Sequence, residues 1–195
     1  IVLAEQGKLD AALACFRKAI EIDPTYAVPH YHVGKVLHIQ NKFDVAIACY
    51  RMSIQLDPQF ASAHLNLGVL VELQGRWDEA VACYRKAIEI DPKNAVALDN
   101  LGRIFRRQGK LDEAKDCFRK AIEVAPSAPS PYINFGAIIC DQGDPAAAID
   151  LFRKAIRLEP KNANAYVSLG YALNAQGQLD DAIEGYRRAI ELDPK

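Results

Sequence analysis

The sequence predicts an all-α solenoid, a fold in which short helical repeats stack one against the next. A proline recurs at one constant interval without any insertion, at Pro24, Pro58, Pro92, Pro126, Pro160 and Pro194. Glycine and aromatic columns follow the same period, at Gly34, Gly68, Gly102, Gly136 and Gly170 and at Phe16, Tyr50, Tyr84, Phe118, Phe152 and Tyr186. A fixed period of this length is typical of stacked-repeat proteins, in which each unit buries its apolar face only against its neighbours.

Each repeat is predicted to hold two helices joined by a tight turn. In the first, at residues 61–74, apolar residues recur at helical spacing. Gly75 follows it and suits the left-handed conformation that ends a helix. The second helix opens with acidic residues, which suit its positive end, and stops at an Asp-Pro pair, because the residue before proline is disfavoured in helical geometry. The turn residue in the other repeats is Asn41, Gly109, Gly143 or Gly177.

The residues Leu67-Gly68, Ala80, Tyr84, Ala87 and Pro92, at these spacings, resemble the tetratricopeptide repeat (TPR), a helix–turn–helix unit of about 34 residues. The resemblance covers the chain as a single array, 1–195, and implies a right-handed superhelical solenoid of antiparallel helix pairs. Asparagine two residues before Gly68, Gly102 and Gly136 is most similar to the superhelical type found in O-linked N-acetylglucosamine transferase. The predicted array consists of a partial repeat, 1–26, and the repeats 27–60, 61–94, 95–128, 129–162 and 163–195.

Two local features refine this picture. Gly68 and Ala80 are expected to let the two helices of a repeat approach closely, so a large side chain at Gly102 or Ala114 should overpack the seam. The stretch 126–131 (PSAPSP) allows two interpretations. In the first interpretation, the prolines lie in the first turn of the next helix, where proline is tolerated, and that helix starts slightly late. In the second interpretation, the curvature of the solenoid changes at this stretch.

Composition narrows the class of protein. A net charge of −1 argues against broad attraction to nucleic acid or to an anionic membrane, and no run approaches the roughly 18 apolar residues of a membrane span. Nothing at the N-terminus resembles a signal peptide. Cys15, Cys49, Cys83 and Cys117 share one repeat position, and neighbouring repeats should hold them about 8–10 Å or more apart, beyond the roughly 7 Å limit for a disulfide. We therefore predict reduced thiols, a cytoplasmic location, and neither a metal site nor a cofactor.

The resemblance implies that the first helices line a concave groove that grips a peptide segment. Two residues before the glycine of the first helix stand His32, Asn66, Asn100, Asn134 and Ser168. A carboxamide both donates and accepts hydrogen bonds, so the three asparagines form a ladder that suits the backbone of an extended peptide. The alternative is that these asparagines only bond neighbouring helices.

Basic residues gather on the same face at one place. Arg103, Arg106 and Arg107 lie at helical spacing, and guanidinium groups suit carboxylates or phosphates of a ligand. Lys35 and His38 extend this basic track two repeats earlier. The alternative is that the arginines are solvated or paired within the chain. Candidate partners are Asp99, which lies four residues before Arg103, together with Glu72 and Asp141.

Other known site types are not matched by this sequence. Chaperone-binding TPRs clamp a terminal carboxylate with a lysine three residues before the glycine, and this chain has no lysine there. His30 and His64 stand where the family places a large aromatic residue, so packing is their expected role. No nucleophile–base pair, zinc motif or phosphate-binding glycine loop occurs, and we predict that the chain is not an enzyme.

The function predicted from the resemblance is a protein–protein interaction scaffold that binds a peptide of a partner, with an acidic partner favoured and neither nucleic acid nor membrane as a ligand. One alternative is the substrate-recruiting arm of a larger enzyme, such as a glycosyltransferase. Another is a homo-oligomer that assembles through its uncapped terminal repeats, because solenoids normally end in polar capping units. The apolar stripe that would be left open is Ile183, Tyr186, Ala189 and Ile190.

Overall fold

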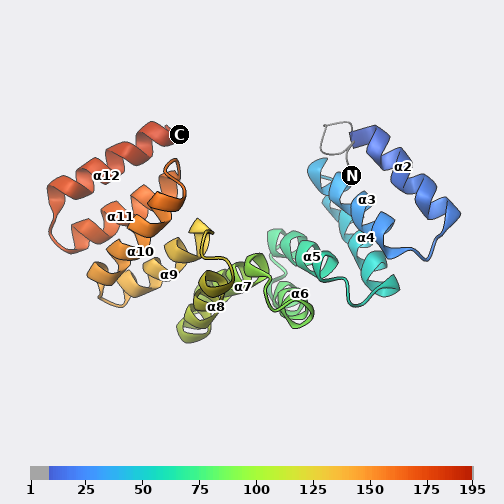
Figure 1. Ribbon diagram of the computed structural model, residues 1–195, viewed down its shortest axis with the longest axis horizontal. Helices are drawn as coiled ribbons and strands as arrows, with labels where there is room; N and C mark the ends of the chain where they lie inside the picture. The colour runs from blue at the N-terminus through green and yellow to red at the C-terminus, as the bar shows by residue number, and fades with distance from the viewer. Residues whose placement is uncertain (1–8, 195) are drawn as a thin grey trace. The chain divides into compact units, whose positions relative to one another are not determined.

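The computed structural model describes residues 9–194, and within them the chain forms eleven α-helices and no strand (Figure 1). The predicted all-α solenoid of helical repeats is confirmed. The helices are α2 (Leu9–Ile22), α3 (Ala27–Ile39), α4 (Phe43–Leu56), α5 (Ala61–Leu73), α6 (Trp77–Ile90), α7 (Ala95–Arg107), α8 (Leu111–Val124), α9 (Pro129–Asp141), α10 (Pro145–Leu158), α11 (Ala163–Ala175) and α12 (Leu179–Leu192).

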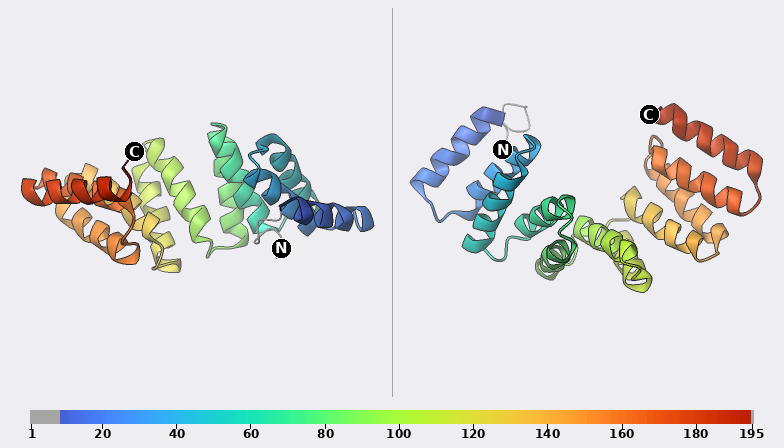
Figure 2. Two further views of the ribbon diagram at one scale, coloured as in Figure 1. Left: turned by 90° about the horizontal axis from the view of Figure 1, so that it is seen from above. Right: turned by 180° about the vertical axis from the view of Figure 1, so that it is seen from behind.

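The helices divide between two compact units, Ile1–Pro92 and Lys93–Lys195. Inside each unit, consecutive helices form antiparallel pairs, as the views of Figure 2 show. In the first unit α3 packs on α4 and α5 on α6, while α4 also contacts α5. In the second unit the pairs are α7 with α8, α9 with α10 and α11 with α12, and α8–α9 and α10–α11 contacts join neighbouring repeats. A single array that runs through both units stays a prediction.

The turn inside each repeat has the backbone geometry expected from its sequence. Gly75 has a φ of 74°, and its N–H donates to the carbonyl of Glu72 while that of Arg76 donates to the carbonyl of Val71, both at 2.9 Å. These two bonds are the Schellman arrangement that ends a helix at a left-handed residue. Asn41, with a φ of 58°, occupies the same place one repeat earlier, because asparagine tolerates this conformation better than other residues with a side chain.

The core of each repeat is an aromatic ring laid against a glycine. The side chains of Tyr50, Tyr84 and Phe118 have no exposed surface. Each ring covers the glycine of the preceding helix so closely that a methyl group on Gly102 would lie 2.7 Å from Cε1 of Phe118. Real Cβ atoms do not approach that closely, so the helix spacing in each pair depends on the missing side chain.

The loops between repeats are tied by a recurring side-chain contact. The Nε2 atoms of His30 and His64 lie 3.2 and 3.0 Å from the carbonyl oxygens of Pro24 and Pro58. In the second unit the hydroxyl of Tyr132 donates at 3.0 Å to the proline carbonyl six residues before it. Both histidines are half-buried, which agrees with their expected packing role, and they additionally hold the loop through this bond.

The proline-rich stretch 126–131 does not delay the helix that follows it. Helix α9 begins at Pro129, which holds the same repeat position as Ala95 and Ala163, the first residues of α7 and α11. The expected late start is therefore wrong. Proline fits this first position because the N–H that it lacks has no partner inside a helix. A change of curvature at this junction stays a prediction.

We expect Gly102→Ala to lower the free energy of unfolding by about 1–3 kcal/mol, because its methyl group collides with the Phe118 ring. Urea unfolding of the full chain followed by circular dichroism measures the change. In a chain that already carries Phe118→Leu, the ring is gone, so adding Gly102→Ala should lower the free energy of unfolding by less than it does in the wild type. Gly109→Ala is the matched control, since no atom lies within 4 Å of its added methyl group and its cost comes from its φ of 74°. Phe118→Leu should not relieve that cost. If Phe118→Leu changes the cost of Gly102→Ala and of Gly109→Ala by the same amount, the Phe118 ring is not the cause of the Gly102→Ala effect.

Candidate functional site

In the first unit, the first helices α3 and α5 carry three predicted site residues, His32, Lys35 and Asn66. The His32 ring stacks on Phe16 of α2, with centroids 4.8 Å apart and planes 12° from parallel. Burial, reinforced by the nearby Lys35 cation, lowers the pKa of His32 below its usual value, so the imidazole is neutral at pH 7. Lys35 is exposed, and its Nζ lies 5.9 Å from the centroid of the Tyr31 ring.

Asn66 links the two repeats of this unit. Its Nδ2 donates to the hydroxyl of Tyr31 on α3 at 3.1 Å. Tyr31 in turn packs on Phe60, with ring centroids 4.8 Å apart, and burial raises the pKa of its hydroxyl. The amide therefore braces the seam between α3 and α5.

In the second unit, Asn134 takes part in an equivalent link between α9 and α7. Asp99 is buried, with 8% of its surface exposed, and its two oxygens accept hydrogen bonds from Ser130 Oγ at 2.6 Å and from Asn134 Nδ2 at 2.9 Å. Asn100, the next residue, accepts through Oδ1 from Arg103 at 3.0 Å. The hydrogen bonds of Asn66 and Asn134 thus join neighbouring helices. Ser168, at the equivalent place on α11, is half-buried.

The arginines of the basic cluster have contacts inside the chain. The guanidinium group of Arg106 lies 3.2 Å from Asp141 on α9, with both side chains well exposed, and Arg103 donates to Asn100. Arg107 is exposed at the end of α7. Asp99, which the sequence suggested as a partner of Arg103, instead accepts from Ser130 and Asn134. An exposed ion pair contributes only about 0–1 kcal/mol, so a ligand carboxylate can displace it at little cost.

Two important residues were not recognised as partners of the asparagines. Tyr31 and Asp99 share one repeat position, three residues before the glycine, and each accepts a hydrogen bond from the asparagine 35 residues later. The Arg106–Asp141 pair has the same separation. A search for complementary polar residues at this separation would have found all three links from the sequence.

The cysteines are free thiols in the structure. Cys83 and Cys117 are buried, and burial raises the pKa of the Cys83 thiol to about 11. Burial also raises the pKa of Cys49. The thiols of Cys49 and Cys83 are therefore protonated at pH 7 and unreactive, because the thiolate is the reactive form.

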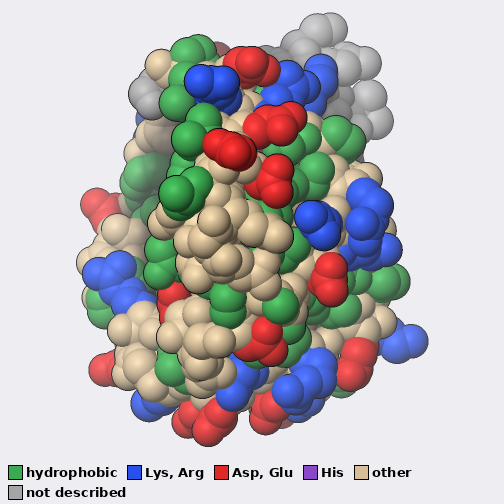
Figure 3. Space-filling view, turned by 90° about the vertical axis from the view of Figure 1, so that its left-hand side faces the viewer, with side chains coloured by type: hydrophobic (Ala, Val, Ile, Leu, Met, Phe, Trp, Pro, Cys, Tyr) green, Lys and Arg blue, Asp and Glu red, His purple; other side chains and the backbone are tan. Residues whose placement is uncertain are grey.

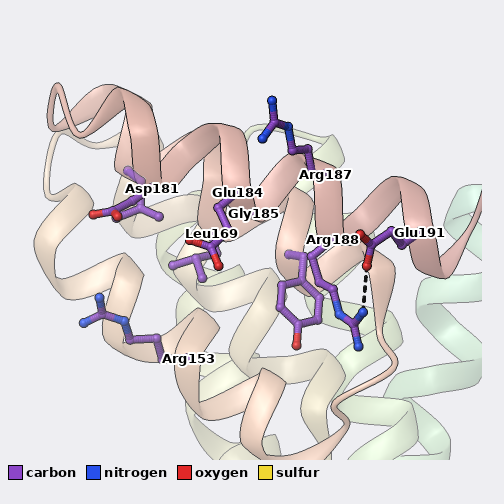
Figure 4. A pocket seen from close by; sticks show the side chains of 10 residues that line it. Arg153, Leu169, Asp181, Glu184, Gly185, Arg187, Arg188 and Glu191 are labelled. Carbon is purple, nitrogen blue, oxygen red and sulfur yellow. Dashed lines mark hydrogen bonds and ion pairs between the residues drawn. The ribbon is translucent and has the colours of Figure 1, made fainter.

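A separate hollow of about 570 Å³ lies on the last helices of the second unit. Figure 4 shows it between α11 and α12, with Leu169 on one wall and the ion pair of Arg188 and Glu191, 2.7 Å apart, at one end. On α12, Ile183 and Ile190 are 48% and 64% exposed, whereas Tyr186 is half-buried and Ala189 is buried. The apolar stripe predicted on this helix is therefore open at its two isoleucines.

The surface carries charges of both signs. On the face shown in Figure 3, Lys and Arg side chains alternate with Asp and Glu side chains around apolar patches. No helix within residues 9–194 combines the length and the apolar character that crossing a membrane requires.

Sequence models described as tetratricopeptide repeat or TPR repeat match residues 59–127, 141–195, and 2–39 with 34–75. The chain belongs to the tetratricopeptide repeat family. A search of curated proteins finds no significant match. The narrower resemblance to the superhelical TPR type stays a prediction.

Solved TPR structures have the same fold. The crystal structure of MamA protein is 25% identical, with a TM-score of 0.72 over 87% of this chain and 93% of that one. YrrB, described as a TPR protein with an unusual peptide-binding site, is 23% identical, with a TM-score of 0.73 over 92% and 93%. PilF of Pseudomonas aeruginosa is 22% identical, with a TM-score of 0.87 over 98% and 87%.

We expect Asn134→Ala to lower the free energy of unfolding by about 1–3 kcal/mol, because the buried Asp99 carboxylate loses a hydrogen-bond donor. Ser168→Ala, at the equivalent place, is the matched control and should change stability by about 0.5 kcal/mol or less. Chemical denaturation of the full-length variants tests both. A Ser168→Ala change as large as that of Asn134→Ala would show that the Asp99 bond carries no special weight.

Proposed function

We propose that this TPR chain is a non-catalytic scaffold that binds a peptide segment of a partner protein along the exposed faces of its first helices. The observation that carries the proposal is the placement of polar and cationic side chains on α3, α5, α7 and α9, next to the hydrogen-bonded asparagines. YrrB, a protein of the same fold, has a peptide-binding site, which supports the same use here. The free thiols fit a reducing cytoplasm.

The asparagines would serve two roles in this proposal. Asn66 donates from Nδ2 to Tyr31, and Asn134 donates from Nδ2 to Asp99 and to Ser130, which fixes the direction of each amide group. A fixed amide loses less entropy on binding than a mobile one, so it is well suited to pair with a peptide backbone. The amide oxygen of each side chain would accept a hydrogen bond from the ligand.

The arginines would set a preference for acidic peptides. Arg106 already binds a carboxylate, that of Asp141, at the surface of the second unit. A peptide carboxylate or phosphate can take the place of Asp141, because the exposed Arg106–Asp141 pair contributes little and makes a single contact, whereas an incoming group can bind the guanidinium through two. Lys35 would act in the same sense in the first unit.

A library of immobilised extended peptides, graded in acidity, tests the proposal. We expect acidic peptides to bind the wild type and to bind Arg103→Ala/Arg106→Ala/Arg107→Ala about 10-fold or more weakly, since charged hydrogen bonds contribute about 1.5–3 kcal/mol. The control replaces Arg119, Arg153 and Arg157, arginines of the second helices, with alanine. It removes the same charge from helices outside the proposed face and should retain binding.

Failure of every peptide to bind the wild type would overturn the proposal. Equal losses in the two triple variants would also count against it, because the effect would then come from net charge and not from α7.

A second candidate function, self-assembly, is favoured by the surface of α12. Ile183 is 48% exposed there, whereas Ile149, its equivalent on α10, is 5% exposed under α11. The α10–α11 contact shows that a face of this type accepts a helix of this chain, and a second copy is the occupant we propose.

We expect the light-scattering mass of the wild type to rise with concentration, and that of Ile183→Glu/Ile190→Glu to stay at the monomer value. Val45→Glu, at another exposed apolar residue, is the control and should assemble like the wild type. A wild type that is monomeric at every concentration would rule out self-assembly.

A further inference from the structure

The hollow of about 570 Å³ on the last helices lies wholly inside the second unit (Figure 4). Its volume falls within the range of about 300–1,000 Å³ that is usual for ligand pockets. Helix α10 contributes Arg153, and α11 contributes apolar residues, Leu169 among them. The residues that α12 contributes are Asp181, Glu184, Gly185, Arg187, Arg188 and Glu191.

In the first unit, an ion pair spans the equivalent groove. Arg51 on α4 and Glu79 on α6 lie 2.7 Å apart. Arg153 and Asp181 hold the same positions in the last repeat. The aspartate side chain is shorter than that of glutamate, and within residues 9–194 Arg153 forms neither an ion pair nor a side-chain hydrogen bond. The last repeat therefore lacks the link that joins the two second helices.

A glycine also replaces the side chain that fills this groove in other repeats. Gly185 holds the position of Cys83, which is buried, and of Leu151, which is half-buried. Leu169 in the hollow is half-buried, whereas the equivalent Leu67 is buried. Gly185 lies inside α12 without a positive φ, so the backbone does not require glycine there. Since glycine weakens a helix interior, this residue opens the groove at a cost in stability.

The preceding repeat shows what fits beneath an arginine at this position. Arg119 holds the position of Arg153, and its Cζ lies 6.0 Å from the centroid of the Phe135 ring. At this distance a guanidinium group is attracted to the negative face of an aromatic ring. In the last repeat Leu169 stands in place of Phe135. That repeat thus keeps the arginine and lacks the ring.

The charges around the hollow favour a neutral occupant. Three of its lining residues are arginines and three are acidic, and one of each, Arg188 and Glu191, pair with each other at 2.7 Å. Equal numbers of cations and anions give no net attraction for an acidic or a basic ligand. An aromatic side chain carries no charge, gains free energy by leaving water, and is attracted to a nearby cation through its ring.

We propose that this hollow is a second docking site, which takes an aromatic side chain of a partner protein. The ring would lie on Leu169 over Gly185 and beneath the Arg153 guanidinium group, in the way that Phe135 lies beneath Arg119. The site goes beyond the proposed peptide-binding face, because α10, α11 and α12 form it without the ordered asparagines or the arginines of α7. A partner bound there leaves the faces of α3, α5, α7 and α9 free for a peptide.

The variants Gly185→Leu and Arg153→Met test the proposal on the full chain. Gly185→Leu restores the residue type that stands at this position in the preceding repeat. A Cβ on Gly185 meets its nearest atoms at 3.4 Å, an ordinary contact, so the urea midpoint should stay the same or rise. Arg153→Met removes the charge and keeps most of the side-chain length. Arg157→Met is the matched control, since Arg157 is exposed one turn later on α10 and does not line the hollow.

Amide chemical-shift titrations with short peptides measure the binding. The peptides are acetylated and amidated, and consist of glycine and serine around one central phenylalanine, cyclohexylalanine or alanine. We expect the wild type to bind the phenylalanine peptide about 10-fold or more tightly than the alanine peptide, with shifts around Gly185. Gly185→Leu should abolish this difference. The ratio of the phenylalanine to the cyclohexylalanine affinity should fall about 3-fold in Arg153→Met and stay unchanged in Arg157→Met.

Each outcome decides for or against the site. Equal binding of the phenylalanine and alanine peptides, or phenylalanine binding that Gly185→Leu leaves intact, would overturn it. Shifts confined to α3, α5, α7 and α9 would do the same. A ratio that Arg153→Met leaves unchanged would overturn the aromatic ligand, since any apolar side chain would then serve.

Two further measurements separate this site from the functions proposed above. If no peptide binds, and Gly185→Leu abolishes a rise of light-scattering mass with concentration, the occupant is a second copy of this chain and the assigned partner is wrong. Binding of acidic peptides reports on the peptide-binding face alone, and Gly185→Leu should leave it unchanged. A loss of acidic-peptide binding in Gly185→Leu would show that the hollow is not a separate site.

Discussion

The contact between an aromatic ring and a glycine is the constraint on which the rest of each repeat depends. In every pair the ring of the second helix lies where a Cβ of the first helix would have to be, at 2.7 Å for Gly34, Gly68, Gly102 and Gly136 and 2.8 Å for Gly170. This close approach sets the spacing of the two helices and therefore the direction in which their outer side chains point. This fixed helix spacing also places the polar residues of the first helices at regular intervals.

A second layer of contacts fixes polar side chains on this regular frame. Hydrogen bonds and an ion pair between equivalent positions of neighbouring repeats join Asn66 to Tyr31, Asn134 to Asp99 and Asp141 to Arg106. These contacts occupy part of the bonding capacity of each group and hold it in place. Prior ordering of this kind lowers the entropic cost of binding, so a role in stability and a role in recognition are compatible in the same side chain.

Most of the fold could be predicted because each residue type that recurs at one repeat position is required there by local packing or backbone geometry. The glycine of the first helix is required by the ring, and Gly75 is required by a left-handed backbone. The proline stretch before α9 misled the prediction of its start, since proline at a first helical position costs nothing and shifts no boundary. The partners of the asparagines were missed because they depend on contacts between repeats.

The most direct test of the account is to map where a bound acidic peptide perturbs the amide chemical shifts of the full chain. The account predicts that the largest shifts cluster on the first helices α3, α5, α7 and α9, around Lys35, Asn66 and Arg106. Shifts confined to the second helices α4, α8 and α10, or to the open face of α12, would contradict it. In that case the ordered asparagines would serve only to hold the repeats together.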